Sequence, residues 1–211
     1  MAPPPIDTVG EAAPVPPRIW QRRLGYALIA VWLVVGFIGI GSLAVNHTTS
    51  MPPPDDETKL TRAILAHRRH AGTTFVAHVI ASDCSCTKRL FDHLLVRGAF
   101  PGVDEVVVFV GDDPAKQRAA ESRGFGFSTV SAGALATHYA LESAPVLLVF
   151  DAAGTMRYVG GYFDSPKALL PLDETIYAQV VNGKAPRSLP VFGCAVSPSL
   201  RKAVDPLGIV Y

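Results

Sequence analysis

The sequence is short of cysteine, carries no excess of charge of either sign and contains no internal repeat. Its 211 residues include three cysteines, too few for the disulfide framework of a small secreted scaffold. With 19 basic and 18 acidic residues the formal net charge is +1, so the chain lacks the excess positive charge that binds the phosphate backbone of a nucleic acid. We therefore expect no nucleic-acid partner. The odd cysteine count leaves at least one thiol free or only transiently paired, which favours thiol chemistry over structural crosslinking.

One long stretch carries no charge at all. Residues 24–45 read LGYALIAVWLVVGFIGIGSLAV and, at about 1.5 Å per residue, can cross a hydrocarbon core of about 30 Å. The run predicts a transmembrane helix. A cleaved signal peptide is the alternative, because Ser42 and Ala44 are small residues placed as in a cleavage site. The apolar region of such peptides is usually about 7 to 15 residues, shorter than this run.

The charges around this run predict its orientation. Arg18, Arg22 and Arg23 stand immediately before it, whereas the first lysine or arginine after it is Lys59. Because positive charge is retained on the cytoplasmic side, we expect the N-terminus in the cytoplasm and the rest of the chain in the periplasm or an equivalent exported space. The sequence thus predicts a single-pass protein of the cell inner membrane.

The remaining sequence is predicted to form one folded domain with appendages, since about 100 to 200 residues per domain is usual. Prolines crowd the first 17 residues and oppose a helix there, and three consecutive prolines before Asp55 favour an extended spacer. The predicted division is a disordered cytoplasmic arm at 1–23, the transmembrane helix at 24–45, a proline-rich linker at 46–54, the folded domain at 55–182 and a C-terminal extension at 183–211 that carries Cys194.

Within the folded domain, hydrophobic periodicity switches repeatedly between strand and helix. Short apolar, β-branched runs are typical of buried strands, and apolar residues three and four apart are typical of helices. Strands are predicted at 74–81, 103–110, 125–130, 146–151 and 155–162, and helices at 55–69, 87–97, 114–124, 132–141 and 166–181. This order predicts an α/β fold, with a mixed sheet covered by helices on both faces.

Several features together resemble a known family. Cys84 and Cys86 follow the first strong strand and precede a helix. Ser143-Ala144-Pro145 immediately precedes the third strong strand, and a hairpin with a closing Gly-Tyr follows. With the tethered, exported layout, residues 73–181 resemble a thioredoxin-like domain of the membrane-anchored thiol-disulfide oxidoreductase or redoxin type. The resemblance implies a thioredoxin-like mixed sheet flanked by helices, no cofactor, and disulfide exchange with exported protein or small-molecule thiol clients. It names no redox partner.

The cysteine pair carries the expected chemistry. A helix N-terminus stabilises a thiolate, which is the nucleophile of thiol-disulfide exchange. We favour Cys84 as the nucleophile, because the first cysteine is the exposed one in related motifs, and we expect Cys86 or Cys194 to resolve the mixed disulfide. The run departs from the family pattern, since it is Cys-x-Cys without a preceding Trp. A bond from Cys84 to Cys86 would close a very small ring, so the two pair under strain or do not pair with each other. Buried, inert cysteines are the other alternative.

The resemblance also implies roles for three further residues. Cys194 ends a Pro-Val-Phe-Gly-Cys run similar to redoxin tails, so it would fold back to resolve a mixed disulfide or to bond one member of the pair. A packed or solvent-exposed Cys194 is the alternative. Pro145 would be the cis-proline that faces the cysteines, and with Ala144 it would bind the substrate through its backbone. A trans proline at a strand edge is the alternative.

Two other function classes remain open. Three thiolates would make a soft site suited to copper(I), and a copper(I)-binding thioredoxin-like chaperone would add a histidine. His78, His93 and His138 stand at no spacing that compels ligation, and a lone histidine on an apolar strand is more often core. We therefore predict no metal ligand. A non-catalytic adaptor is the third class, because a fold does not fix a function.

Overall fold

The N-terminal part of the chain is one long helix. The computed structural model describes residues 19–48, 50–82, 84–205 and 208, and the chain divides into two units, Met1–Ser42 and Leu43–Tyr211. Helix α1 (Ile19–Thr48) begins earlier and ends later than the predicted span. Residues 19–23 of the predicted disordered arm are thus helical, and the rest of that arm lies outside the described residues. Ile19–Gly41 has the length and apolar composition to cross a membrane, a test that a signal sequence also passes.

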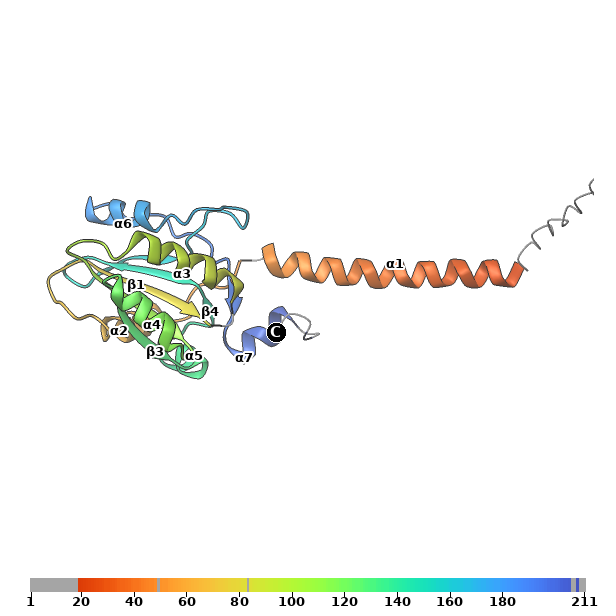
Figure 1. Ribbon diagram of the computed structural model, residues 1–211, viewed down its shortest axis with the longest axis horizontal. Helices are drawn as coiled ribbons and strands as arrows, with labels where there is room; N and C mark the ends of the chain where they lie inside the picture. Colours follow the sequence, from red (N-terminus) through yellow and green to blue (C-terminus); the bar gives the residue numbers. More distant parts are fainter. Residues whose placement is uncertain (1–18, 49, 83, 206–207, 209–211) are drawn as a thin grey trace, which may run out of the picture. The chain divides into compact units, whose positions relative to one another are not determined.

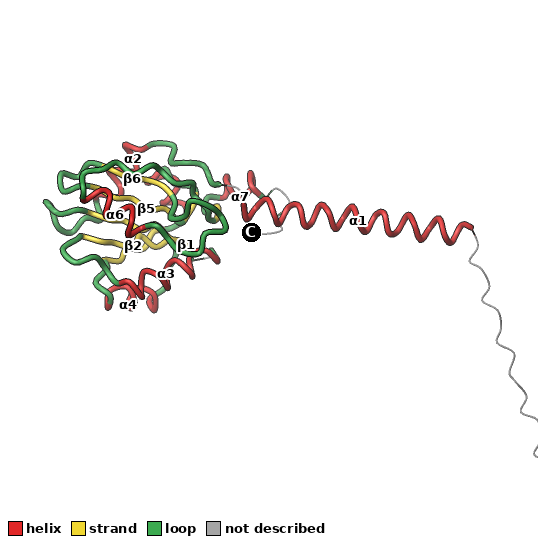
Figure 2. Tube along the Cα trace, turned by 90° about the horizontal axis from the view of Figure 1, so that it is seen from above, coloured by secondary structure: helices red, strands yellow, loops and turns green. Residues whose placement is uncertain are grey.

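The second unit is built on a five-stranded mixed sheet with the order β3-β2-β1-β5-β6 (Figures 1 and 2). The three strands β3, β2 and β1 are parallel, whereas β5 runs antiparallel to both β1 and β6. Every residue of β1, β2 and β5 is buried, as expected for central strands covered on both faces. The strands are β1 (Phe75–Ala81), β2 (Asp104–Val110), β3 (Gly126–Val130), β5 (Val146–Phe150) and β6 (Met156–Gly160).

Helices cover both faces of this sheet. Helices α3, α4 and α6 contribute to one apolar cluster, and α2, α5 and the C-terminal residues contribute to the other. Alternate residues of β1 point into each cluster, with Val76 and Ile80 on the α3 side and Ala77 and Val79 on the α2 side. The helices are α2 (Glu57–Leu65), α3 (Ser85–Arg97), α4 (Pro114–Ser122), α5 (Ala132–Tyr139) and α6 (Asp173–Val181). The predicted α/β fold, a mixed sheet flanked by helices and preceded by an apolar helix, is confirmed.

Several helix boundaries differ from the prediction, among them the ends of α2, α4 and α5 and the starts of α3 and α6. Helix α3 begins at Ser85 rather than Thr87, so Cys86 lies inside its first turn. Helix α6 begins at Asp173 rather than at Pro166. The cause of the later start of α6 is Pro171, because a proline in a helix interior lacks the N–H of the hydrogen-bond ladder and clashes with the preceding turn. The helix therefore starts only after this proline.

The C-terminal residues are an integral part of the fold rather than an appendage. They form a two-residue strand β7 (Cys194–Ala195), paired antiparallel with β4 (Ser143–Ala144), and a last helix α7 (Pro198–Val204). None of these three elements was predicted. The linker, predicted as an extended spacer, is docked on the domain at Met51, whose side chain is buried and whose N–H donates to the Val191 carbonyl at 2.8 Å.

Candidate functional site

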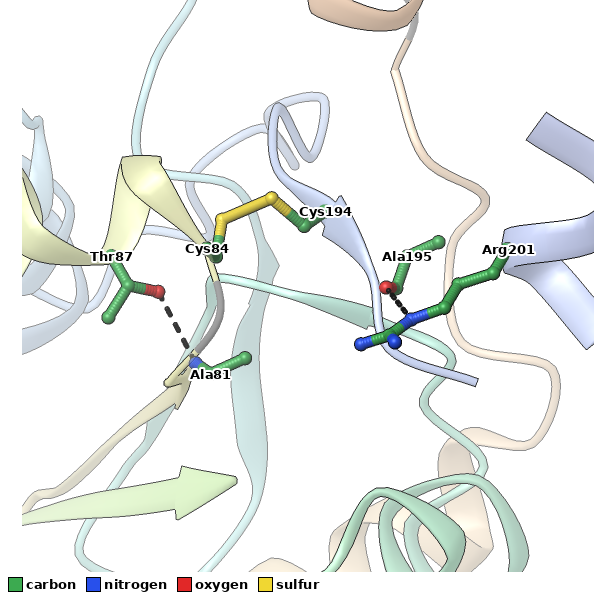
Figure 3. Close-up of a disulfide and its surroundings, with 6 residues drawn as sticks. All are labelled: Ala81, Cys84, Thr87, Cys194, Ala195 and Arg201. Atoms are coloured by element: carbon green, nitrogen blue, oxygen red, sulfur yellow. Dashed lines mark hydrogen bonds between the residues drawn. A yellow bond between two sulfur atoms is a disulfide. The ribbon is translucent and has the colours of Figure 1, made fainter. Parts of the chain in front are cut away.

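A disulfide joins Cys84 to Cys194 across 110 residues of sequence, with their Cα atoms 5.8 Å apart. Figure 3 shows the bond between the start of α3 and strand β7. Cys86 remains a free thiol. The sequence left the pairing of the three cysteines open. The structure pairs the first with the third, so the strained ring between Cys84 and Cys86 is not formed.

Backbone contacts at the end of β1 hold Cys84 at the N-terminus of α3. Cys84 is the N-cap residue, in an extended conformation, and its side chain makes no capping hydrogen bond. The N–H of Thr87 donates to the Cys84 carbonyl at 3.0 Å. The Ala81 N–H donates to the Thr87 hydroxyl at 3.3 Å (Figure 3). Cys84 is therefore held at the N-terminus of α3, where the helix dipole stabilises negative charge.

Cys194 is positioned by the short ladder between β4 and β7. In this ladder Ala144 lies opposite Cys194. The Arg201 side chain, from α7, donates through Nε to the Ala195 carbonyl at 3.1 Å (Figure 3). The Val196 N–H donates to the carbonyl of Glu142 at 2.7 Å. Neither the arginine nor the glutamate was singled out from the sequence. The Glu142 contact joins distant chain segments, and the Arg201 contact is made to a strand too short to be recognised from its periodicity.

A second set of contacts docks the chain just before Cys194 against the β5–β6 hairpin. The Gly161 N–H donates to the Leu189 carbonyl at 3.0 Å. The Tyr158 hydroxyl donates to the Gly161 carbonyl at 2.6 Å and accepts from the Leu189 N–H at 3.3 Å. Burial raises the pKa of Tyr158 to about 12, opposed by the hydrogen bond from Leu189. The phenol therefore stays protonated, and remains a donor, at any physiological pH.

Pro145 follows a cis peptide bond, as the resemblance implied. Residues 144 and 145 lie directly against the C-terminal residues, since a Cβ atom added to Gly193 would stand 2.0 Å from the Ala144 carbonyl oxygen and 2.7 Å from Pro145 Cδ. The backbone of Ala144, predicted to bind a substrate together with Pro145, is thus paired with the protein's own strand β7 in this structure. Substrate binding by Ala144 and Pro145 stays a prediction.

The cysteines differ in exposure. Cys84 is only 4% exposed, whereas Cys86 and Cys194 are half-buried. Cys84 is therefore not the exposed cysteine that the resemblance implied, because in the disulfide-bonded protein the C-terminal residues pack beside it. Its role as the nucleophile stays a prediction.

A cavity of about 620 Å³ lies between α3 and α4 and reaches Cys84. Two ion pairs line it, one joining Lys88 to Asp92 at 2.7 Å and the other joining Lys116 to Asp113. Since each lysine is matched by a carboxylate, the rim has no net charge. The apolar part of the lining is Phe91, Leu95, Ala115 and Ala119.

The described residues hold no group of three or more histidine, cysteine, aspartate or glutamate side chains placed to bind a metal ion. His78 contacts Glu105 and Tyr162, and His93 contacts Asp173. Two of the three histidines considered for copper(I) are therefore engaged elsewhere, and two of the three sulfurs are bonded to each other.

Replacing Gly193 with alanine tests whether close backbone packing holds Cys194 in place. The added methyl would collide with the Ala144 carbonyl, and overpacking of this kind typically costs about 1 to 3 kcal/mol. Because this strain opposes the position of Cys194 in the disulfide, we expect the reduction potential of the Cys84–Cys194 bond to rise by roughly 20 to 65 mV. Equilibration with glutathione buffers measures it.

The matched control is Gly133→Ala in α5. An added Cβ meets nothing within 4 Å there and the backbone is helical, so the potential should not move. An unchanged reduction potential in Gly193→Ala would show that the segment before Cys194 adapts to the extra methyl group without destabilising the disulfide.

Comparisons with known proteins bear on the fold. No family model and no curated protein matches the chain. A hypothetical protein from Sinorhizobium meliloti superposes with a TM-score of 0.50 at 18% identity, over 59% of this chain and 79% of that one. A secreted Mycobacterium tuberculosis disulfide oxidoreductase homologous to E. coli DsbE gives 0.36 at 14% identity, over 64% and 97%. StoA from Bacillus subtilis gives 0.30 at 19% identity, over 43% and 75%. The first likeness shows a shared fold alone, and the other two are too distant to bear on this chain.

Proposed function

We propose that the protein is a thiol-disulfide oxidoreductase whose working redox couple is Cys84–Cys194. The observation that carries this proposal is the position of the bond, with one sulfur at a helix N-terminus and the other on a short strand beside a cis-proline. A purely structural crosslink has no need of a helix N-terminus, whereas a reactive thiolate is stabilised by one.

The reaction is an exchange of one disulfide for another. In the reducing direction, a thiolate of the reduced pair attacks a client disulfide, forms a mixed disulfide and releases one client thiolate. The second cysteine of the pair then attacks the mixed disulfide and releases the other client thiolate. The client gains two electrons, the protein loses two, and the two thiols of the pair give up their protons. Cys86 needs no part in this cycle.

The proposed setting is the outer face of a cell inner membrane. Helix α1 would anchor the chain with its N-terminus in the cytoplasm, because arginines precede the apolar run and are absent directly after it. The second unit would then lie in an oxidising space, where disulfides persist. Its clients would be exported proteins or small-molecule thiols and disulfides.

The proposal is tested by equilibrating full-length protein, in detergent micelles, with glutathione buffers of graded potential. Each sample is acid-quenched and alkylated, and the labelled cysteines are identified by mass spectrometry. We expect one two-electron transition in which Cys84 and Cys194 change together while Cys86 is labelled throughout. A bond that stays closed at every potential tested would identify a structural crosslink, and three thiols that never oxidise would remove the redox function altogether.

A further inference from the structure

The two sulfurs of the disulfide are unequally accessible to a client. An attacking thiolate must approach one sulfur from the side opposite its bonded partner, so access to each sulfur decides where the exchange begins. Cys84 is 4% exposed. Cys194 is half-buried, and so are the two residues before it, Phe192 and Gly193. Of the two bonded residues, Cys194 is therefore the more accessible to a polypeptide client.

The two sulfurs also differ as leaving groups. If Cys194 is attacked, the electron pair of the broken bond goes to Cys84. That sulfur belongs to the N-cap residue of α3, a helix of 13 residues, and makes no capping hydrogen bond. An N-cap side chain can accept a hydrogen bond from the amide of the second helical residue, here Cys86, whereas the Thr87 N–H already donates to the Cys84 carbonyl. A stabilised thiolate leaves faster. Attack on Cys194 is therefore favoured both by the greater exposure of Cys194 and by the stabilisation of the departing Cys84 thiolate.

We propose that Cys194 is the sulfur that exchanges with polypeptide clients, and that Cys84 is the internal thiolate that leaves and later closes the bond again. This inference rests on the proposed function. It reverses the order that the resemblance implied, in which the first cysteine meets the client. Strand β7 is held by β4 and by Arg201, so Cys194 reacts from its docked position without release of the C-terminal residues.

The electrons and atoms of the oxidising direction balance as follows. A client thiol loses its proton to solvent, and its thiolate attacks Cys194 Sγ. A new bond joins the client to Cys194, the bond to Cys84 breaks, and Cys84 becomes a thiolate. A second client thiolate then attacks the client sulfur of the mixed disulfide and releases Cys194. The client loses two electrons in forming its disulfide, and the two cysteines of the protein gain them.

The cavity beside α3 offers a competing route for small reagents. Because Cys84 forms part of its lining, a small thiol that enters the cavity can approach Cys84 itself, but the backbone of a folded client cannot follow. The inference therefore concerns polypeptide clients, and its test needs a peptide rather than a small thiol as the probe.

The test maps the first mixed disulfide. Oxidised full-length protein carrying Cys86→Ser, in detergent micelles, is mixed with a ten-residue peptide containing one cysteine, acid-quenched at the earliest times, alkylated and digested. Mass spectrometry should find the peptide on Cys194 and the alkyl label on Cys84, in at least tenfold excess over the opposite arrangement. The Cys86→Ser background removes the third thiol, so that no internal exchange through it can move the peptide.

Two outcomes would overturn the inference. A peptide found mainly on Cys84 would reject it while leaving the redox couple and the glutathione transition intact. No mixed disulfide at all, together with no transition in the glutathione titration, would reject the proposed function along with it. A second variant guards against slow rearrangement: in Cys84→Ser, Cys194 should still capture a peptide disulfide and hold it as a stable adduct, because the resolving thiol is missing.

Discussion

Replacing Cys84 with serine is expected to reduce turnover with insulin or a model peptide disulfide to below about 1% of the wild-type rate, because Cys194 is then left without the partner thiolate that completes the exchange. Whichever cysteine of the pair meets the client first, each catalytic cycle needs both. The rate of insulin reduction with dithiothreitol as the electron donor measures the effect. Under these reducing conditions the bond to Cys194 is open in the wild type as well.

Cys86→Ser is the matched control for this experiment. Cys86 lies two residues away in the first turn of α3, and it is a free thiol outside the disulfide. We expect this variant to keep wild-type turnover. Circular dichroism of both variants in dithiothreitol would show whether they fold equally well. Full activity in Cys84→Ser, or an equal loss in both variants, would contradict the assignment of the redox couple.

The elements that sequence reasoning placed correctly are those with a local signal. Strand β1 was predicted at 74–81 and lies at Phe75–Ala81, because an uninterrupted β-branched run has few alternatives to a buried strand. Helix α3 was predicted to end at residue 97 and does so, with Gly98 as its C-cap at φ of 74°, a conformation that glycine adopts without steric penalty.

The parts that were missed depend on partners far away in the sequence. Strands β4 and β7 have two residues each and pair across about 50 positions, so neither carries a periodicity that could be recognised. The bond between Cys84 and Cys194 spans 110 residues, and no spacing in the sequence favours it over the other pairings. Only the resemblance to redoxin tails suggested that Cys194 returns to the site.

One missed feature did have a signal. The buried run Val103–Val110 contains Asp104 and Glu105, and a carboxylate on a central strand must find a partner because burying an unpaired charge is costly. The structure supplies such partners from Arg69 for the first acid and from His78 and Arg97 for the second. A search for basic residues able to reach this strand would have moved His78 from the copper candidates to a buried ion pair.

Glu105 is the centre of this buried polar network. Its Oε1 atom accepts from His78 Nε2 at 2.7 Å and from Arg97 Nη2 at 2.5 Å, and its Oε2 atom accepts from the Phe100 N–H at 2.7 Å. Arg97 also pairs with Asp173 at 3.1 Å. The side chains of Glu105 and Asp173 are at most 1% exposed. The network ties β1, β2, α3 and α6 together on one face of the sheet.

Burial raises the pKa of Glu105, but the hydrogen bonds and charges of His78 and Arg97 outweigh it and hold the pKa below its ordinary value. A carboxyl group with a lowered folded-state pKa stabilises the protein above its unfolded pKa of about 4.3. That stabilisation is lost as the pH falls through the folded pKa. The contribution of ionised Glu105 is therefore complete at pH 7 and disappears only in acid.

Glu105→Gln should lower the free energy of unfolding by about 3 to 5 kcal/mol at pH 7, the range found when one partner of a buried ion pair is removed. Whichever way the amide turns, its NH₂ group faces N–H donors that the carboxylate accepted, and the Arg97 charge loses its closest partner. Urea unfolding of residues 50–211, which keep Met51 in its buried position, measures the loss.

Glu121→Gln on the exposed surface of α4 is the control and should change stability by less than about 0.5 kcal/mol. The gap between wild type and Glu105→Gln should narrow as the pH falls below about 4, because protonation of Glu105 removes the same charge from the wild type. A gap of constant size down to pH 2 would show that the loss comes from altered packing and not from the charge.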